Sequence, residues 1–163
     1  MARKRGRPGA HAVTVALAAL AAGLTPALAV AAVAEPSKGV VVKAVYNKAL
    51  KATILVDGRG FTLYVWTADV PKNTSVCDPD PGCTKLWQPL SPPSTAGPGA
   101  KASLLGTSTD GNVVTYAGHP LYFFKGGAGI GPADKKPGQL NGQGVYQVWY
   151  VITPKGTLIK KIP

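Results

Sequence analysis

The sequence predicts an all-β protein that is built from two copies of one small unit. The pattern G-x-x-L-Y-x-aromatic occurs at residues 60–66 and again at residues 118–124, displaced by 58 positions from Leu63 to Leu121. About eight short runs of β-branched and aromatic residues alternate with Gly, Pro and Asp, and no amphipathic helix is expected after residue 35. These observations predict two antiparallel β repeats in a pseudo-twofold relation, which form one sandwich or barrel-like domain.

The first 34 residues have the features of a secretory signal peptide. Four basic side chains lie within residues 1–7, residues 12–34 carry no charge, and an A-x-A site precedes Glu35. The uncharged run is also long enough for an uncleaved membrane anchor, which needs about 20 residues, but Pro26 and the small residues at the end of the run favour cleavage. We therefore expect a protein that is secreted or located in the extracytoplasmic cell envelope.

Residues 35–163 are expected to form a single β domain. Its repeats lie at about residues 40–90 and 103–160, and a Pro/Gly/Ser-rich linker at residues 91–102 separates them. Asp-Gly pairs, which favour tight hairpin turns, occur in both repeats. The expected strands lie at residues 40–45, 53–56, 61–66, 112–116, 120–124, 145–153 (the longest) and 157–162.

The chain is strongly basic, with a net charge of +11. Four of its 18 basic side chains belong to the expected signal peptide, which leaves 14 against seven acids and a net charge of +7 for residues 35–163. Most of the lysines are scattered singly, as on a solvated surface. Outside a membrane such a surface attracts anionic groups, so the expected partner is an anionic cell-envelope polymer or the membrane surface. Nucleic acid is not expected as a partner of an exported protein.

Both cysteines, Cys77 and Cys83, lie in the expected mature region. An even number of cysteines in an exported protein predicts a disulfide, which would stabilise so short a loop by about 2 to 3 kcal/mol. The five intervening residues do not match a thioredoxin-like C-x-x-C motif. Asp78 and Asp80 alternate as calcium ligands would, but the prolines between and after them do not match a calcium-binding loop.

Tyr64, Trp66 and Asp69 match the pattern Y-x-[FWY]-x-x-D. Residues 115–124 read T-Y-x-G-x-P-L-Y-x-F, and residues 141–151 read N-G-Q-G-V-x-x-x-W-Y-V. In these motifs the chain resembles a bacterial family of secreted proteins and predicted lipoproteins with the Y-x-[FWY]-x-x-D motif, a secreted repeat of unknown function. The resemblance covers about residues 42–155 and implies a repeat and an export route, but no activity. Because no cysteine lies near the junction at the end of the signal peptide, the lipid anchor of a lipoprotein is not expected.

The motif has two interpretations. On a strand, Tyr64 and Trp66 project from one face and Leu63 and Val65 from the other, while Asp69 follows the strand and caps a turn. The structural interpretation is a packed aromatic pair with an acid that holds a turn. The functional interpretation is an aromatic platform, with an acid beside it, that stacks on a sugar ring or another flat ligand.

The second copy departs from the motif at the acid. The position that corresponds to Asp69 is Gly127, and an acid appears only at Asp134, which either takes the same role or leaves this copy without one. Trp66, Trp87, Phe124 and Trp149 are expected in or beside the core. The candidate structural or binding residues are Tyr64, Trp66, Asp69, Trp87, Tyr122, Phe124 and Trp149.

Catalytic residues are not expected, because no serine or cysteine nucleophile with a neighbouring base is recognisable and the acids are scattered. His119 is the only histidine after the signal peptide, so it is a weak candidate for a metal ligand and no cofactor is expected. We predict a non-enzymatic extracytoplasmic protein that binds a cell-envelope component. The alternatives are a redox or cofactor-linked protein, which transfers electrons through a haem, a metal, the tyrosines or the cysteines, and a purely structural repeat.

Overall fold

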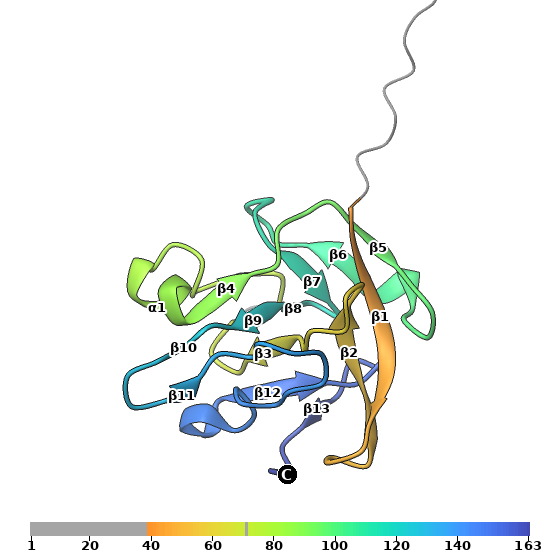
Figure 1. The fold of residues 1–163 in the computed structure, drawn as a ribbon. Coiled ribbons are helices and arrows are strands. Elements are labelled where there is room, and N and C mark those ends of the chain that lie inside the picture. Colours follow the sequence, from red (N-terminus) through yellow and green to blue (C-terminus); the bar gives the residue numbers. More distant parts are fainter. Residues whose placement is uncertain (1–38, 71) are drawn as a thin grey trace, which may run out of the picture. The chain divides into compact units, whose positions relative to one another are not determined.

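A computed structural model describes residues 39–70 and 72–163 (Figure 1). The expected signal peptide, residues 1–34, lies outside the described residues. The strands are β1 (Val40–Asn47), β2 (Ala52–Asp57), β3 (Tyr64–Trp66), β4 (Trp87–Pro89), β5 (Ser94–Ala96), β6 (Leu105–Thr107), β7 (Val114–Tyr116), β8 (His119–Pro120), β9 (Tyr122–Phe124), β10 (Gly126–Gly127), β11 (Gly131–Pro132), β12 (Trp149–Ile152) and β13 (Leu158–Ile159). The helices are α1 (Pro81–Leu86) and the 3-10 helices η1 (Ala102–Leu104) and η2 (Val145–Gln147).

The first hairpin joins β1 and β2 in an antiparallel pair, with Val45 opposite Ile54. Asn47 ends β1, and its side-chain oxygen accepts hydrogen bonds from the backbone N–H groups of Ala49 and Leu50, which closes the turn. Residues of β2 then alternate between two faces: Ile54 and its second neighbour Val56 enter one hydrophobic cluster, while Leu55 enters another. The burial of β2 residues in both clusters therefore holds the hairpin against the core, and after β2 the chain turns towards the central sheet.

The central sheet has five strands in the order β13-β12-β3-β9-β4 (Figure 1). The middle strands β3 and β9 belong to the two copies of the repeated pattern, and they pair antiparallel with Tyr64 directly opposite Tyr122. The strands that flank them cross over between the copies, because β12 pairs with β3 and β4 pairs with β9. The sheet is thus assembled from both halves of the sequence.

The central sheet is covered by apolar residues on both faces. Tyr64 and Trp66 project into one cluster, whereas Leu63 and Val65 are buried in the other, so the alternation expected from the sequence is confirmed. The first cluster contains Leu50, Ile54, Val56, Tyr64, Cys77, Trp87, Tyr122, Phe124, Trp149 and Val151. The second contains Val42, Leu55, Leu63, Val65, Leu90, Val114, Tyr116, Leu121 and Ile152.

The all-β fold class is confirmed. Besides the central sheet, the strands form sheets in the orders β2-β1-β5 and β6-β7-β8 and a pair β10-β11. None of these sheets closes into a barrel within residues 39–70 and 72–163. The pseudo-twofold relation between the repeats stays a prediction.

A short helix accompanies the strands, and one expectation about secondary structure is wrong. The helix, α1, begins after Asp80, whose side chain accepts a hydrogen bond from the N–H of Gly82, and a proline stands in its first turn. The helix is six residues long, too short to show an amphipathic period. Residues 145–153 do not form the longest strand, because η2 occupies 145–147 and Tyr146 has a positive φ of 51°, which leaves only β12 extended. The longest strand is β1.

Candidate functional site

The tryptophans of the two copies form one stack inside the first cluster. The ring centroids of Trp87 and Trp149 lie 3.8 Å apart, and the two ring planes are within 3° of parallel. Trp149 also stacks against Trp66, with a centroid distance of 5.2 Å. Phe124 packs against Trp87 with ring centroids 4.6 Å apart. Trp66 is half-buried, and the other three aromatic side chains are buried. The expected position of these four residues in or beside the core is confirmed.

The tyrosines and acids of the motif bind each other across the two copies. The Tyr64 hydroxyl donates a 2.7 Å hydrogen bond to the carboxylate of Asp134, and the Tyr122 hydroxyl donates a 2.8 Å hydrogen bond to the carboxylate of Asp69. Each tyrosine therefore pairs with the acid of the other copy, not with the acid that follows it in its own motif.

The two acids also hold their own loops in the same way. Asp69 accepts a hydrogen bond from the backbone N–H of Val76, and Asp134 accepts one from that of Asn141; both donors lie seven residues after the acid. Asp134 thus takes in the second copy the role that Asp69 has in the first. Gly127, at the aligned position, instead pairs with Gly131 in the β10-β11 hairpin.

Burial changes the protonation equilibria of these pairs. It raises the pKa of the carboxyls of Asp69 and Asp134 above the ordinary value, because the loss of water outweighs the hydrogen bonds that favour the charged form. The pKa values of the Tyr64 and Tyr122 phenols are also raised, chiefly by burial and further by the neighbouring carboxylates. Both phenols therefore keep their protons and act as donors.

The geometry favours the structural interpretation of the motif over the platform interpretation. Tyr64 and Tyr122 have no exposed surface, and Asp69 is only 3% exposed. A ligand cannot stack on the ring of either tyrosine without opening the core. The motif joins the two halves of the domain.

The predicted disulfide between Cys77 and Cys83 is present. Asp80, one of the two acids between the cysteines, caps α1.

His119 is half-buried on β8, where burial and the nearby charge of Lys72 lower the pKa of its imidazole. In the described part of the chain, no three His, Cys, Asp or Glu side chains are grouped so that they could hold a metal ion.

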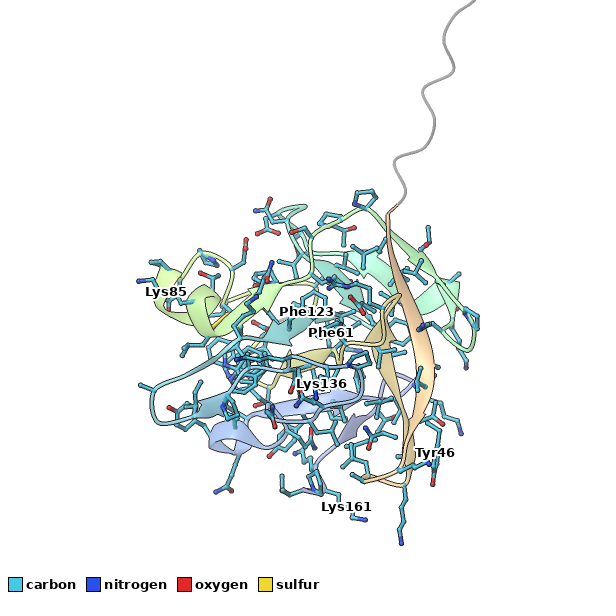
Figure 2. All side chains as sticks on the ribbon, in the orientation of Figure 1. Tyr46, Phe61, Lys85, Phe123, Lys136 and Lys161 are labelled. Atoms are coloured by element: carbon cyan, nitrogen blue, oxygen red, sulfur yellow. A yellow bond between two sulfur atoms is a disulfide. The ribbon has the colours of Figure 1, made fainter. Side chains whose placement is uncertain are left out.

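A surface groove lies beside this core, where the first hairpin turns towards the central sheet. Phe61 and Phe123 lie next to each other on the molecule (Figure 2), and both line a hollow of about 440 Å³. The hollow, which we call the basic groove, is lined by Arg59, Phe61, Thr62, Gln88, Phe123, Phe124, Lys125, Asp134 and Lys135. It combines aromatic surface with three cationic side chains.

Arg59 is the most strongly positioned cation of the basic groove. Its guanidinium Nε donates a 2.8 Å hydrogen bond to the carboxylate of Asp57, and its guanidinium carbon lies 4.9 Å from the ring centroid of Phe61 and 6.0 Å from that of Phe123. Asp57 is itself fixed, because its other oxygen accepts hydrogen bonds from the backbone N–H groups of Arg59 and Phe61. Among the described residues, the terminal amino groups of the guanidinium make no hydrogen bond.

The acids of the described region offset only part of the positive charge of the basic groove. Asp57 is paired with Arg59, one of the three cations, and Asp69 is buried in the core. Asp134 lines the groove, but its two oxygens accept hydrogen bonds from Tyr64 and a backbone N–H. Lys125 and Lys135 are exposed. The groove therefore presents a positive, hydrogen-bond-donating surface.

Sequence reasoning missed the basic groove. Its residues come from four separate segments: the turn after β2, strand β4, strand β9 with the residue that follows it, and the segment after β11. One signal was present, since Arg59 stands in the turn Asp57-Gly58-Arg59-Gly60, whose geometry fixes the direction of its side chain. A second signal was that Lys125 directly follows the second copy of the repeated pattern, so it lies next to the aromatic residues of that copy.

Residues 105–153 match the model of a family described as a secreted repeat of unknown function. This part of the chain is similar to that secreted repeat. The match agrees with the family suspected from the motifs, and it supports an extracytoplasmic protein of unknown specific function. No curated protein and no solved structure matches the chain. In the described part of the chain, no helix has both the length and the apolar character needed to cross a membrane.

Proposed function

We propose that this chain is a non-enzymatic extracytoplasmic protein that binds an anionic group of the cell envelope in the basic groove. The proposal rests on one observation: Arg59, which lines the groove, is held by Asp57 and lies over two phenylalanine rings, while its terminal amino groups make no hydrogen bond within the described residues. A guanidinium with two free amino groups matches the two oxygens of a carboxylate or phosphate. Because Arg59 is already positioned, binding costs little additional side-chain entropy.

The other walls of the groove supply the remaining interactions. Lys125 and Lys135 add two positive charges that attract and retain an anion. Phe61 and Phe123 offer flat apolar surface for the carbon skeleton that carries the anionic group. The net positive charge of the chain increases the rate of encounter with an anionic surface, and salt weakens this attraction.

Retention on isolated cell envelopes, which contain both wall and membrane, tests the proposal. The purified protein, with its native sequence from residue 35 onward, is expected to bind at low salt and to be released as salt increases. Arg59→Ala is expected to weaken binding by about tenfold or more, since one charge-assisted bidentate contact is worth about 1.5 to 3 kcal/mol. Arg59→Lys keeps the charge but loses the planar fork, so it is also expected to weaken binding.

Lys161→Ala is the matched control. Lys161 is exposed and lies well away from Phe61 and Phe123 (Figure 2), so its removal changes the net charge by the same amount without touching the groove. If Lys161→Ala weakens binding as much as Arg59→Ala, retention depends on net charge alone and the basic groove is not the site. If the wild-type protein is not retained at low salt, the proposal is wrong.

A further inference from the structure

A second hollow shares Arg59 and Phe123 with the basic groove. Its volume is about 260 Å³, and these two residues line both hollows. Its lining is Val40, Val41, Asp57, Gly58, Arg59, Leu90 and Phe123. The two hollows thus meet at one arginine and one phenylalanine, and a ligand that reaches from one to the other passes between these side chains.

The second hollow is apolar, in contrast to the basic groove. Val40 and Val41 of β1 are half-buried along it, and the buried Leu90 contributes to its lining. Its one acid, Asp57, is buried and accepts hydrogen bonds from Arg59 and two backbone N–H groups. A sugar hydroxyl placed there would lose water without gaining a partner, whereas an alkyl chain loses nothing.

We propose that the ligand of the groove is an anionic membrane lipid, whose phosphate binds in the basic groove and whose alkyl chain enters the second hollow. This inference rests on the proposed function and names its ligand class. In a lipid the phosphate is separated from the alkyl chain by only a few bonds, and the two hollows are likewise adjacent, since they share Arg59 and Phe123. Arg59 then contacts the phosphate with its amino groups, while Phe123 packs against the beginning of the chain.

Titration with monomeric alkyl phosphates of increasing chain length, beside glycerol phosphate, tests the inference. Affinity is expected to rise with chain length by at most about fourfold for each methylene buried, until the second hollow is full. Glycerol phosphate should bind most weakly, because it fills the basic groove alone. Arg59→Ala should weaken the binding of every alkyl phosphate by a similar factor.

Val41→Ser and Val45→Ser form a matched pair of variants. Both residues lie on β1, but Val41 lines the second hollow whereas Val45 is 41% exposed and does not. Val41→Ser is expected to reduce the gain in affinity with chain length and to leave the binding of glycerol phosphate unchanged. Val45→Ser should change neither. Retention on phosphatidylglycerol vesicles, compared with phosphatidylcholine vesicles, should show the same order of variants.

The outcomes separate this inference from the proposed function. Phosphate binding that depends on Arg59 but not on chain length overturns the lipid inference and leaves the anion site standing. Retention by wall polymers, without retention by phosphatidylglycerol vesicles, has the same consequence. If neither envelopes, alkyl phosphates nor vesicles bind, the proposed function itself fails.

Discussion

The hydroxyl of Tyr64 donates a hydrogen bond to the carboxylate of Asp134, 70 residues further along the chain. The mirror contact, from Tyr122 back to Asp69, spans 53 residues. Two residues that stand in one short motif are therefore not partners of each other. Each copy supplies one donor, the tyrosine of its motif, and one acceptor, which is the motif acid Asp69 in the first copy and the displaced Asp134 in the second. Both hydrogen bonds form only when the two copies are packed together.

Removal of either phenol should destabilise the domain, and Tyr122→Phe should cost more than Tyr64→Phe. Each change leaves a carboxylate without one donor, and such bonds to charged groups are worth about 1.5 to 3 kcal/mol. Asp69 is buried, whereas Asp134 is half-buried beside the basic groove, where water can replace the lost donor. Urea unfolding at neutral pH measures both losses. Equal losses would contradict the expected order of the two variants, and negligible losses would show that these bonds do not join the copies.

The raised pKa of Asp69 predicts a particular pH dependence of stability. Between the ordinary value of 3.8 and the raised value in the fold, the folded protein holds a proton that the unfolded chain has released. The free energy of unfolding contributed by Asp69 therefore falls as pH rises through this window. In Asp69→Asn this fall should be absent, so the stability of the variant relative to wild type should increase from about pH 4 towards neutrality.

The asparagine is a suitable replacement because the network around it can adapt. Its oxygen can accept the backbone N–H of Val76 and its amide can donate to Tyr122, which lies 2.7 Å from the Ser75 hydroxyl. The pKa of Asp110 is lowered, so its contribution to the free energy of unfolding rises with pH. Because Asp110 is present in both the wild type and the variant, this contribution cancels in the comparison. A relative stability that does not change with pH would contradict the raised pKa.

The pairing of the two copies could be predicted only in part from the sequence. The repeated pattern places Tyr64 and Tyr122 at equivalent positions, and strand alternation correctly assigns Tyr64 and Leu63 to opposite faces. The partner of each acid could not be predicted, because β12 and β4 cross over between the copies and this crossing depends on long-range pairing. A displaced acid such as Asp134 has no sequence signal that distinguishes it from a surface residue.

The basic groove and the helix α1 escaped prediction for different reasons. The groove is formed by segments that the sequence separates widely, so only the fold brings Arg59 and Lys135 together. The helix is too short for a periodic pattern, although Asp80 followed by Pro81 is a recognisable start. Short-range chemistry predicts turns and caps, whereas a site assembled from distant turns requires the tertiary structure.

Reduction of the disulfide should destabilise the domain only moderately. Cys77 and Cys83 are six positions apart, and closing so short a loop is expected to contribute about 2 to 3 kcal/mol. Cys77 is fully buried in the first cluster, so the double variant Cys77→Ala/Cys83→Ala also removes some packing. Urea unfolding with and without reductant separates the two effects. A fully unfolded reduced protein would show that the cysteine loop organises the whole core.

Gly142→Ala should disturb the tryptophan stack, whereas Gly129→Ala should not. A methyl group at residue 142 would lie 2.9 Å from Phe124 Cβ and 2.9 Å from Trp87 Cη2, inside a buried cluster. Crowding of this kind costs about 1 to 3 kcal/mol, and here it would also shift the N–H that donates to the Tyr64 hydroxyl. Near-ultraviolet circular dichroism, which reports on stacked tryptophans, is expected to change together with the unfolding midpoint. Gly129→Ala is the control: nothing lies within 4 Å of its methyl group, so it carries only the backbone cost of a positive φ and should leave the spectrum unchanged.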